Sequence, residues 1–165
     1  MNLYILDKNP FGCASAYSDA HTIKYCREYA FILSAIHQIT NSEYANNVLS
    51  MDYKNRNYTD CPITKWVLES EYNYFWLYLM WKALSCEYKQ ITGCDNPYFV
   101  TNDIYLKRVP EINKNVAQTP FPFLVPLEYK GSDIVESYRK YYLSGRVRGV
   151  AWIKKTKPTW ADNNV

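Results

Sequence analysis

Residues 62–92 read PITKWVLESEYNYFWLYLMWKALSCEYKQIT and have the longest helical periodicity in the chain. Asp60 or Cys61 can cap the start of this helix, Pro62 fits its first turn, and Gly93 is a typical stop. An unbroken helix of this length measures about 45 Å and would cross the whole domain. We therefore expect a central scaffold helix whose tryptophans lie in the core. One stripe along it carries Trp66, Ser70, Asn73, Leu77, Trp81 and Leu84.

The N-terminal part of the chain predicts one or two helices and a loop. Residues 3–6 are a short apolar run followed by a turn at 7–10, which indicates an extended start that then bends. Residues 14–39 have helical periodicity and end in polar residues. Residues 46–60 are rich in Asn, Asp and Tyr and lack that periodicity, so they predict a loop.

The C-terminal part begins with a segment in which a long helix is excluded. Residues 96–129 predict an extended covering loop with one short helix near 98–109, because proline interrupts helices and restricts the residue before it. Asp133 and Glu136 form a capping-box-like pair that predicts a helix as far as residue 142 or 143, before Gly145. The prolines of the covering loop are at positions 97, 110, 120, 122 and 126.

Length and composition indicate one folded domain. A chain of 165 residues with 48% hydrophobic and 21% charged residues can bury one sizeable core. We therefore expect a mainly α protein. Its architecture should be a compact single-domain helical bundle over residues 1–165, around one long central helix, with an extended proline-rich covering loop. The 17 Tyr and 5 Trp suit both a core and a surface that stacks bases.

The cysteines and histidines argue against several classes of protein. Five cysteines without a CxxC pair, and no secretory signal pattern, indicate reduced thiols and an intracellular protein. The only histidines, His21 and His37, lack a metal-ligand pattern, so neither a metal nor another cofactor is expected. The aromatic stretch 72–84 contains Asn73 and Lys82 and predicts a buried helix, so no membrane span is expected.

Positive charge is concentrated in the last part of the chain. Residues 130–165 hold eight Lys and Arg against three Asp and Glu, although the whole chain has a formal charge of only +3. This basic segment is either a solvated tail or a surface that contacts phosphates. For the second case the candidate binding residues are Arg139, Lys140, Arg146, Arg148 and Trp152.

A polar cluster interrupts the apolar pattern of the helix predicted within residues 14–39. His21, Lys24 and Glu28 share a stripe that continues as two isoleucines and should face the core. Burial of ionisable groups is costly unless they are paired, so the cluster is either an internal ion pair or a site. We expect these three side chains to converge on a cleft with Arg27 at its rim.

Several motifs resemble a family of small bacteriophage proteins. That family opens with Met-Asn-aliphatic-aromatic-aliphatic-Leu-Asp and carries an Asp-Lys-His-Val-Val-Lys-Met-x-x-Glu helix. The matching segments here are 1–7, 18–28, 61–66, 69–77, 120–129, 138–142, 152 and 158–160.

The phage family in turn is similar to the pyrimidine-dimer DNA glycosylase, or endonuclease V, of bacteriophage. The resemblance rests on His21, Arg27 and Glu28, on a long aromatic helix and on a basic aromatic C-terminal tail. It implies that the helix glutamate manages proton and charge transfer while the amine of an N-terminal Thr attacks the sugar. The chain starts Met1-Asn2, which predicts a retained Met and no such nucleophile, and Cys61 stands where the family usually has His.

Two main hypotheses follow. In the preferred one, a phage protein recognises a nucleotide or nucleic acid without lyase chemistry, for instance as a counter-defence binder that sequesters a small nucleotide signal in the host cytoplasm. Besides the basic tail, its binding residues would be Asn2, Lys24, Tyr25 and Arg27. In the alternative, a DNA glycosylase-like enzyme cleaves an N-glycosidic bond, with Glu28 and His21 as its catalytic residues. A structural or protein-binding role is the third possibility, and the oligomeric state is open.

Overall fold

The computed structural model describes residues 2–49 and 58–162, and within these ranges the chain is helical without strands. The prediction of a mainly α fold is confirmed. The described part holds two short 3₁₀ turns, Leu127–Tyr129 and Thr159–Ala161. Its α-helices are α1 (Pro10–Ala16), α2 (Asp19–Ile39), α3 (Pro62–Leu68), α4 (Glu71–Thr92), α5 (Pro97–Leu106) and α6 (Ile134–Leu143).

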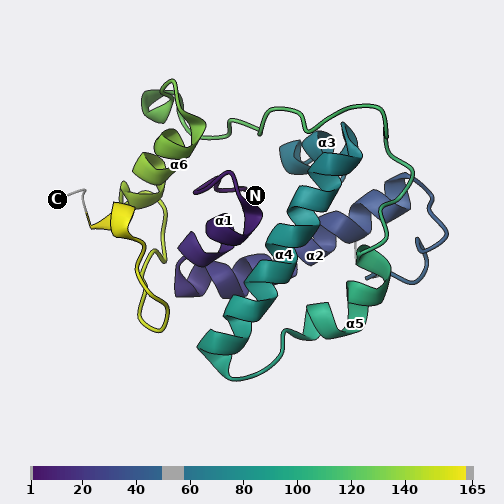
Figure 1. Cartoon of the computed structure of the whole chain (residues 1–165), viewed down its shortest axis with the longest axis horizontal. Coiled ribbons are helices and arrows are strands. Elements are labelled where there is room, and N and C mark those ends of the chain that lie inside the picture. The colour runs from purple at the N-terminus through teal and green to yellow at the C-terminus, as the bar shows by residue number, and fades with distance from the viewer. Residues whose placement is uncertain (1, 50–57, 163–165) are drawn as a thin grey trace.

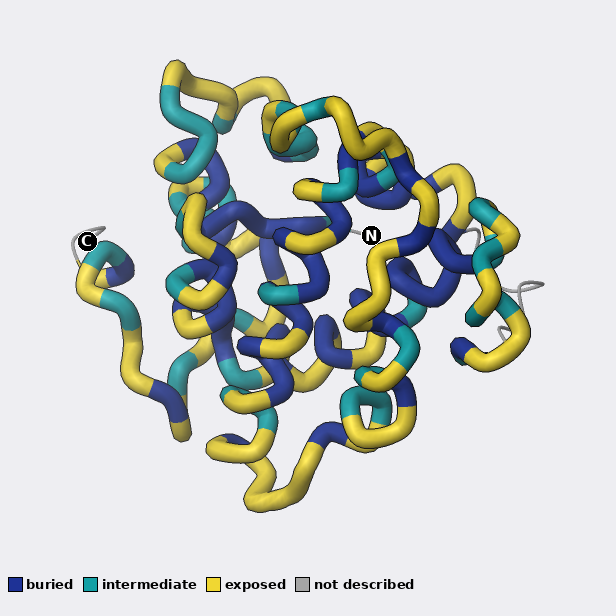
Figure 2. Tube along the Cα trace, turned by 45° about the vertical axis from the view of Figure 1, so that its right-hand side comes forward, coloured by how far each residue is buried: buried dark blue, intermediate teal, exposed yellow. Residues whose placement is uncertain are grey.

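Helix α4 crosses α2 in the middle of the molecule, and α1, α3 and α5 pack against it (Figure 1). The C-terminal stop predicted for this helix is confirmed, because Gly93 ends α4 with φ of 75°. No helix among the described ranges has the length and apolar character that a membrane crossing needs. Buried residues gather in the interior, whereas the connecting segments are largely exposed (Figure 2).

The prediction of one unbroken helix over 62–92 is wrong, because the chain breaks between α3 and α4. Ser70 has an extended backbone, and its hydroxyl accepts a hydrogen bond from the Tyr72 amide at 3.1 Å and donates one to the Val116 carbonyl at 2.6 Å. Asn73 donates its side-chain amide to the Trp66 carbonyl at 2.7 Å, near the end of α3. A serine hydroxyl competes for backbone hydrogen bonds inside a helix and is favoured at an N-cap. Ser70, a polar position of the predicted stripe, therefore starts helix α4 instead of continuing α3.

The sequence predicted one or two helices in the N-terminal segment, and the structure has two. Asn9 caps α1 by accepting hydrogen bonds from the Phe11 and Gly12 amides, so the helix begins at Pro10, earlier than expected. The chain turns at Tyr17 and resumes as α2. Of the predicted loop 46–60, residues 50–57 lie outside the described residues.

The short helix and the capped C-terminal helix are confirmed. Helix α5 ends at Leu106, three residues before the expected end at Val109. Asp133 caps α6 by accepting a hydrogen bond from the Glu136 amide at 2.9 Å. The extended segment after α5 lies over the start of α4, where the ring of Phe121 contacts Trp66 and Trp76.

The expected tryptophan core is confirmed for Trp66, Trp76, Leu77 and Trp81, all of which are buried. Trp81 is fully buried and donates its indole N–H to the Cys26 carbonyl of α2 at 2.8 Å. A single side chain thus links the two longest helices by packing and by a hydrogen bond.

Replacement of Trp81 by Ala should lower the free energy of unfolding by about 3 to 5 kcal/mol, because it leaves a cavity between α2 and α4. Tyr72→Ala in the same helix is the control. Tyr72 is 54% exposed, so its loss should cost about 0.5 kcal/mol or less. Urea denaturation followed by circular dichroism measures both values, and similar losses in the two variants would contradict the assignment of Trp81 to the core.

Candidate functional site

His21 is buried at the start of α2 and bound on both ring nitrogens. Its Nδ1 lies 2.6 Å from the hydroxyl of Tyr142 in α6, and its Nε2 lies 2.9 Å from the carbonyl oxygen of Arg148. A carbonyl only accepts, so Nε2 carries the proton and Nδ1 accepts from the Tyr142 hydroxyl. Burial, with a smaller contribution from Lys24, lowers the pKa of His21 from 6.5 to about 4. The neutral ring therefore ties α2 to α6 and to the C-terminal segment.

Aromatic rings enclose His21 and the predicted binding residue Tyr25. Tyr4 stacks on the imidazole with centroids 5.5 Å apart, and Tyr25 meets its edge at 5.7 Å. Tyr25 is 2% exposed, and burial raises its pKa. Asn2, also predicted to bind ligand, donates its amide to the Tyr4 hydroxyl at 3.3 Å. The structure thus places Tyr25 and Asn2 in the packing around His21.

Glu28 is buried two turns after His21, on the same helix. Its carboxylate accepts hydrogen bonds from the Arg27 guanidinium at 3.2 Å and from the Tyr58 hydroxyl at 3.1 Å. The Arg27 side chain is 44% exposed, whereas that of Glu28 is 2% exposed. Arg27 therefore lies at the border between a buried carboxylate and the surface.

The prediction that His21, Lys24 and Glu28 converge on one cleft is wrong, because Lys24 lines a pocket that His21 and Glu28 do not line. Lys24 is exposed, and its ammonium lies 5.3 Å from the centroid of the Tyr25 ring. At 100° per residue, Lys24 is turned about 60° from His21, away from the buried side of α2. Its long side chain can therefore reach water.

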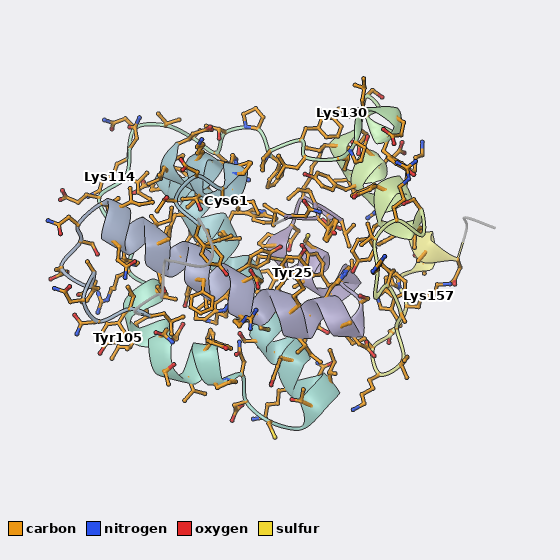
Figure 3. All side chains as sticks on the ribbon, turned by 180° about the vertical axis from the view of Figure 1, so that it is seen from behind. Tyr25, Cys61, Tyr105, Lys114, Lys130 and Lys157 are labelled. Carbon is orange, nitrogen blue, oxygen red and sulfur yellow. The ribbon has the colours of Figure 1, made fainter. Side chains whose placement is uncertain are left out.

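Lys24 and Arg27 instead line a pocket between α2 and the start of α5. In the view from behind, α2 crosses the face of the molecule and α5 lies below it (Figure 3). The pocket has a volume of about 360 Å³, and His21 and Glu28 do not line it. We call it the α2–α5 pocket; its lining residues are Ile23, Lys24, Cys26, Arg27, Tyr88, Asn96, Pro97 and Tyr98.

The wall of the α2–α5 pocket opposite the two cations is a capped helix start. Asn96 accepts a hydrogen bond from the Tyr98 amide at 3.1 Å and donates to the Ser85 hydroxyl of α4 at 2.9 Å. These bonds fix the N-terminus of α5 against α4. Sequence reasoning missed Tyr88 and Tyr98 as site residues, since neither lies in a recognisable motif.

Two of the four predicted basic residues of the C-terminal segment, Arg139 and Arg146, and also Trp152, have partners within the protein. Arg139 donates to the Leu6 carbonyl at 2.9 Å, Arg146 pairs with Glu128, and Trp152 donates to the Ala16 carbonyl at 3.2 Å. Among the described residues, no hydrogen bond or ion pair involves the exposed side chains of Lys140 and Arg148. Arg148 and Trp152 line an open hollow of about 610 Å³.

The basic segment also contains an anchor that the sequence did not reveal. Lys155 is buried, and its ammonium donates to the Ala14 carbonyl at 3.0 Å and the Thr22 hydroxyl at 3.2 Å, and pairs with Glu87 at 3.1 Å. Burial lowers the pKa of Lys155. Nothing in the local sequence distinguishes it from its lysine neighbours, so no signal could have identified it.

No protein-family model, curated protein or solved structure matches the chain. The resemblance to phage proteins therefore remains a prediction from the quoted motifs. Met1, on which the comparison with the glycosylase nucleophile depends, lies outside the described residues. Within the described ranges, no group of three or more His, Cys, Asp or Glu side chains could hold a metal ion.

The buried neutral His21 should make stability depend on pH. Its pKa is about 4 in the folded protein against an ordinary 6.5, so the unfolded chain takes up the proton first as the pH falls. The contribution of the neutral His21 ring to the free energy of unfolding should therefore fall by up to about 3 kcal/mol as the pH is lowered from about 6.5 to 4.

The measurement is urea denaturation of the unmodified protein and of His21→Gln across this pH range. The stability advantage of the unmodified protein should shrink as the pH falls. His37 is present in both proteins, so its own titration cancels in the difference. A difference that stays constant between these pH values would show that His21 is not held neutral by burial.

Proposed function

We propose that this protein binds a small nucleotide in the α2–α5 pocket and holds it without chemical conversion. The observation that carries the proposal is the composition of the pocket. Two exposed cations, Lys24 and Arg27, share one cavity with two tyrosines, Tyr88 and Tyr98. Cationic groups beside aromatic rings are the combination that recognises a phosphate attached to a base.

The phosphate would lie between α2 and the first turn of α5. Lys24 and Arg27 are three residues apart, so their side chains project from neighbouring positions on the helix surface. The positive end of the α5 dipole, at Asn96 and Pro97, faces the same space. Lys24 and the α5 dipole thus supply positive potential for an anion here, and Arg27, which also pairs with Glu28, adds hydrogen-bond donors.

The base would stack on the tyrosine rings of the pocket. Tyr88 and Tyr98 are partly exposed, so each has ring surface accessible to a ligand. The side-chain amide of Asn96, which could otherwise read a base edge, is already used within the protein. Stacking tolerates every base, so the pocket should depend on the phosphate more than on the base.

The volume of about 360 Å³ suits a small ligand, because ligand pockets begin at about 300 Å³. A protein that holds such a ligand without converting it lowers its free concentration. This is the sequestration role given as an example in the preferred hypothesis.

Replacement of Lys24 by Gln should weaken binding of AMP and of UMP about tenfold, because a charge-assisted contact to the phosphate is lost. Lys24 suits the test since its contact within the protein is with the Tyr25 ring. Isothermal titration calorimetry at two salt concentrations measures the affinities, which should fall as salt rises.

The matched control is Lys82→Gln, which removes an exposed lysine of α4 that does not line the pocket. Adenosine, which lacks the phosphate, should bind much more weakly than AMP. Equal loss of affinity in the two lysine variants, or equal binding of adenosine and AMP, would refute the assignment of the site.

A second candidate function is hydrolysis of an N-glycosidic bond. It is favoured by the buried carboxylate of Glu28, which Arg27 connects to the edge of the α2–α5 pocket. A carboxylate near an anomeric carbon can stabilise the positive charge that develops as the bond breaks.

Replacement of Glu28 by Gln separates the two functions. Under the proposed binding function, neither form releases free base from a nucleotide or from dimer-containing DNA, and only the affinity changes. Chromatography of the products measures base release. If the unmodified protein released base and Glu28→Gln abolished release while still binding, the hydrolase would replace the binder.

A further inference from the structure

A second pocket, at the other end of α2, has different chemistry from the α2–α5 pocket. It has a volume of about 400 Å³ and lies between the last turn of α2, the residues that follow it, and the segment after α5. We call it the α2 C-terminal pocket. The lining residues that matter here are His37, Glu43, Tyr44, Arg108, Pro110 and Glu111.

Hydrogen bonds hold the residues at the floor of the α2 C-terminal pocket in place. His37 is completely buried, with Nδ1 at 2.7 Å from the Ser42 hydroxyl and Nε2 at 2.9 Å from the Tyr74 hydroxyl. The Tyr74 hydroxyl donates to the Leu106 carbonyl at 2.8 Å, so Nε2 of His37 is the donor to Tyr74. These bonds join α2, α4 and the end of α5 beneath the pocket.

Backbone hydrogen bonds also hold the turn after α2, which forms one wall of the pocket. The Ser42 amide donates to the His37 carbonyl at 2.9 Å, and the Asn41 amide donates to the Gln38 carbonyl at 3.1 Å. Asn41 has φ of 50°, which completes a Schellman cap. The cavity therefore exists before any ligand arrives, and binding would require little ordering of the chain.

Charges of both signs line the pocket without pairing with each other. Arg108, Glu43 and Glu111 are all exposed, and no ion pair within the described part of the chain joins Arg108 to either carboxylate. The negative end of the α2 dipole points at the same space. An anion alone would meet two carboxylates, and a cation alone would meet Arg108.

We infer that the α2 C-terminal pocket binds a small zwitterion of the α-amino acid class. The ammonium group lies between Glu43 and Glu111, near the negative end of α2. The carboxylate takes the guanidinium of Arg108, which can bind it through two parallel hydrogen bonds. The remaining volume accepts a side chain.

This inference does not rest on the proposed nucleotide binding. The α2 residues that line the two pockets lie on opposite halves of the helix, at 23–27 in one pocket and at His37 in the other. Ten residues of helix separate them by about 15 Å. The two sites can therefore be tested with separate variants of the same full-length chain.

The test is a titration of the ¹⁵N-labelled full-length protein with each of the twenty standard L-amino acids at millimolar concentration, followed by amide chemical shifts. We expect at least one amino acid to shift the amides of residues 41–44 and of Arg108, Val109 and Glu111. Its N-acetyl derivative and its carboxamide should each bind at least about tenfold more weakly, because each lacks one of the two charges.

Arg108→Gln and the double variant Glu43→Gln/Glu111→Gln should each weaken binding of the same amino acid at least about tenfold. Lys107→Gln, which changes an exposed neighbour of Arg108, should leave this binding unchanged. These side chains are exposed, and the unperturbed spectrum of each variant verifies that it folds. Lys24→Gln should leave amino acid binding unchanged. The inference is overturned if no amino acid shifts these amides, if a blocked form binds equally well, or if the variants of Arg108 and Lys107 behave alike.

Discussion

The packing of Trp81 against α2 fixes the rotation of that helix about its axis, and the remaining features of the molecule depend on this rotation. The indole N–H needs an acceptor when buried, and it finds the Cys26 carbonyl. Ile23, Lys24 and Arg27 of the same helix stay exposed to solvent, and together with Cys26 they line the α2–α5 pocket. One buried contact therefore joins α2 to α4 directly beside the residues that line the pocket.

His21 and Glu28 lie between the buried and exposed sides of α2, and other segments of the chain cover them. The hydroxyl of Tyr142 and the carbonyl of Arg148 cover His21, and Tyr58 contacts Glu28. Each contact satisfies a polar group that would otherwise be costly to bury. These two residues therefore anchor distant segments, and the basic C-terminal segment is held against α2 more tightly than a solvated tail would be.

Local signals in the sequence were sufficient to predict the structure at positions where a single residue type decides the conformation or the burial. The left-handed stop at Gly93, the cap at Asp133 and the buried tryptophans are of this kind. The break at Ser70 was missed because helical periodicity outweighed a polar position whose partner, the Val116 carbonyl, is 46 residues away. The candidate site was predicted only in part: Lys24 and Arg27 were expected to bind, but the sequence could not show that Tyr88 and Tyr98 line the same pocket.

The short helix α5 explains how one surface of α2 supports two pockets. Its capped N-terminus provides Asn96, Pro97 and Tyr98 to the α2–α5 pocket, and the residues just after its C-terminus provide Arg108 to the α2 C-terminal pocket. Helix α5 packs on α2 between these points, and its Leu106 carbonyl accepts from Tyr74. The packing of α5 on α2 thus sets the positions of residues in both pockets, because the chain enters α5 at one pocket and leaves it next to the other.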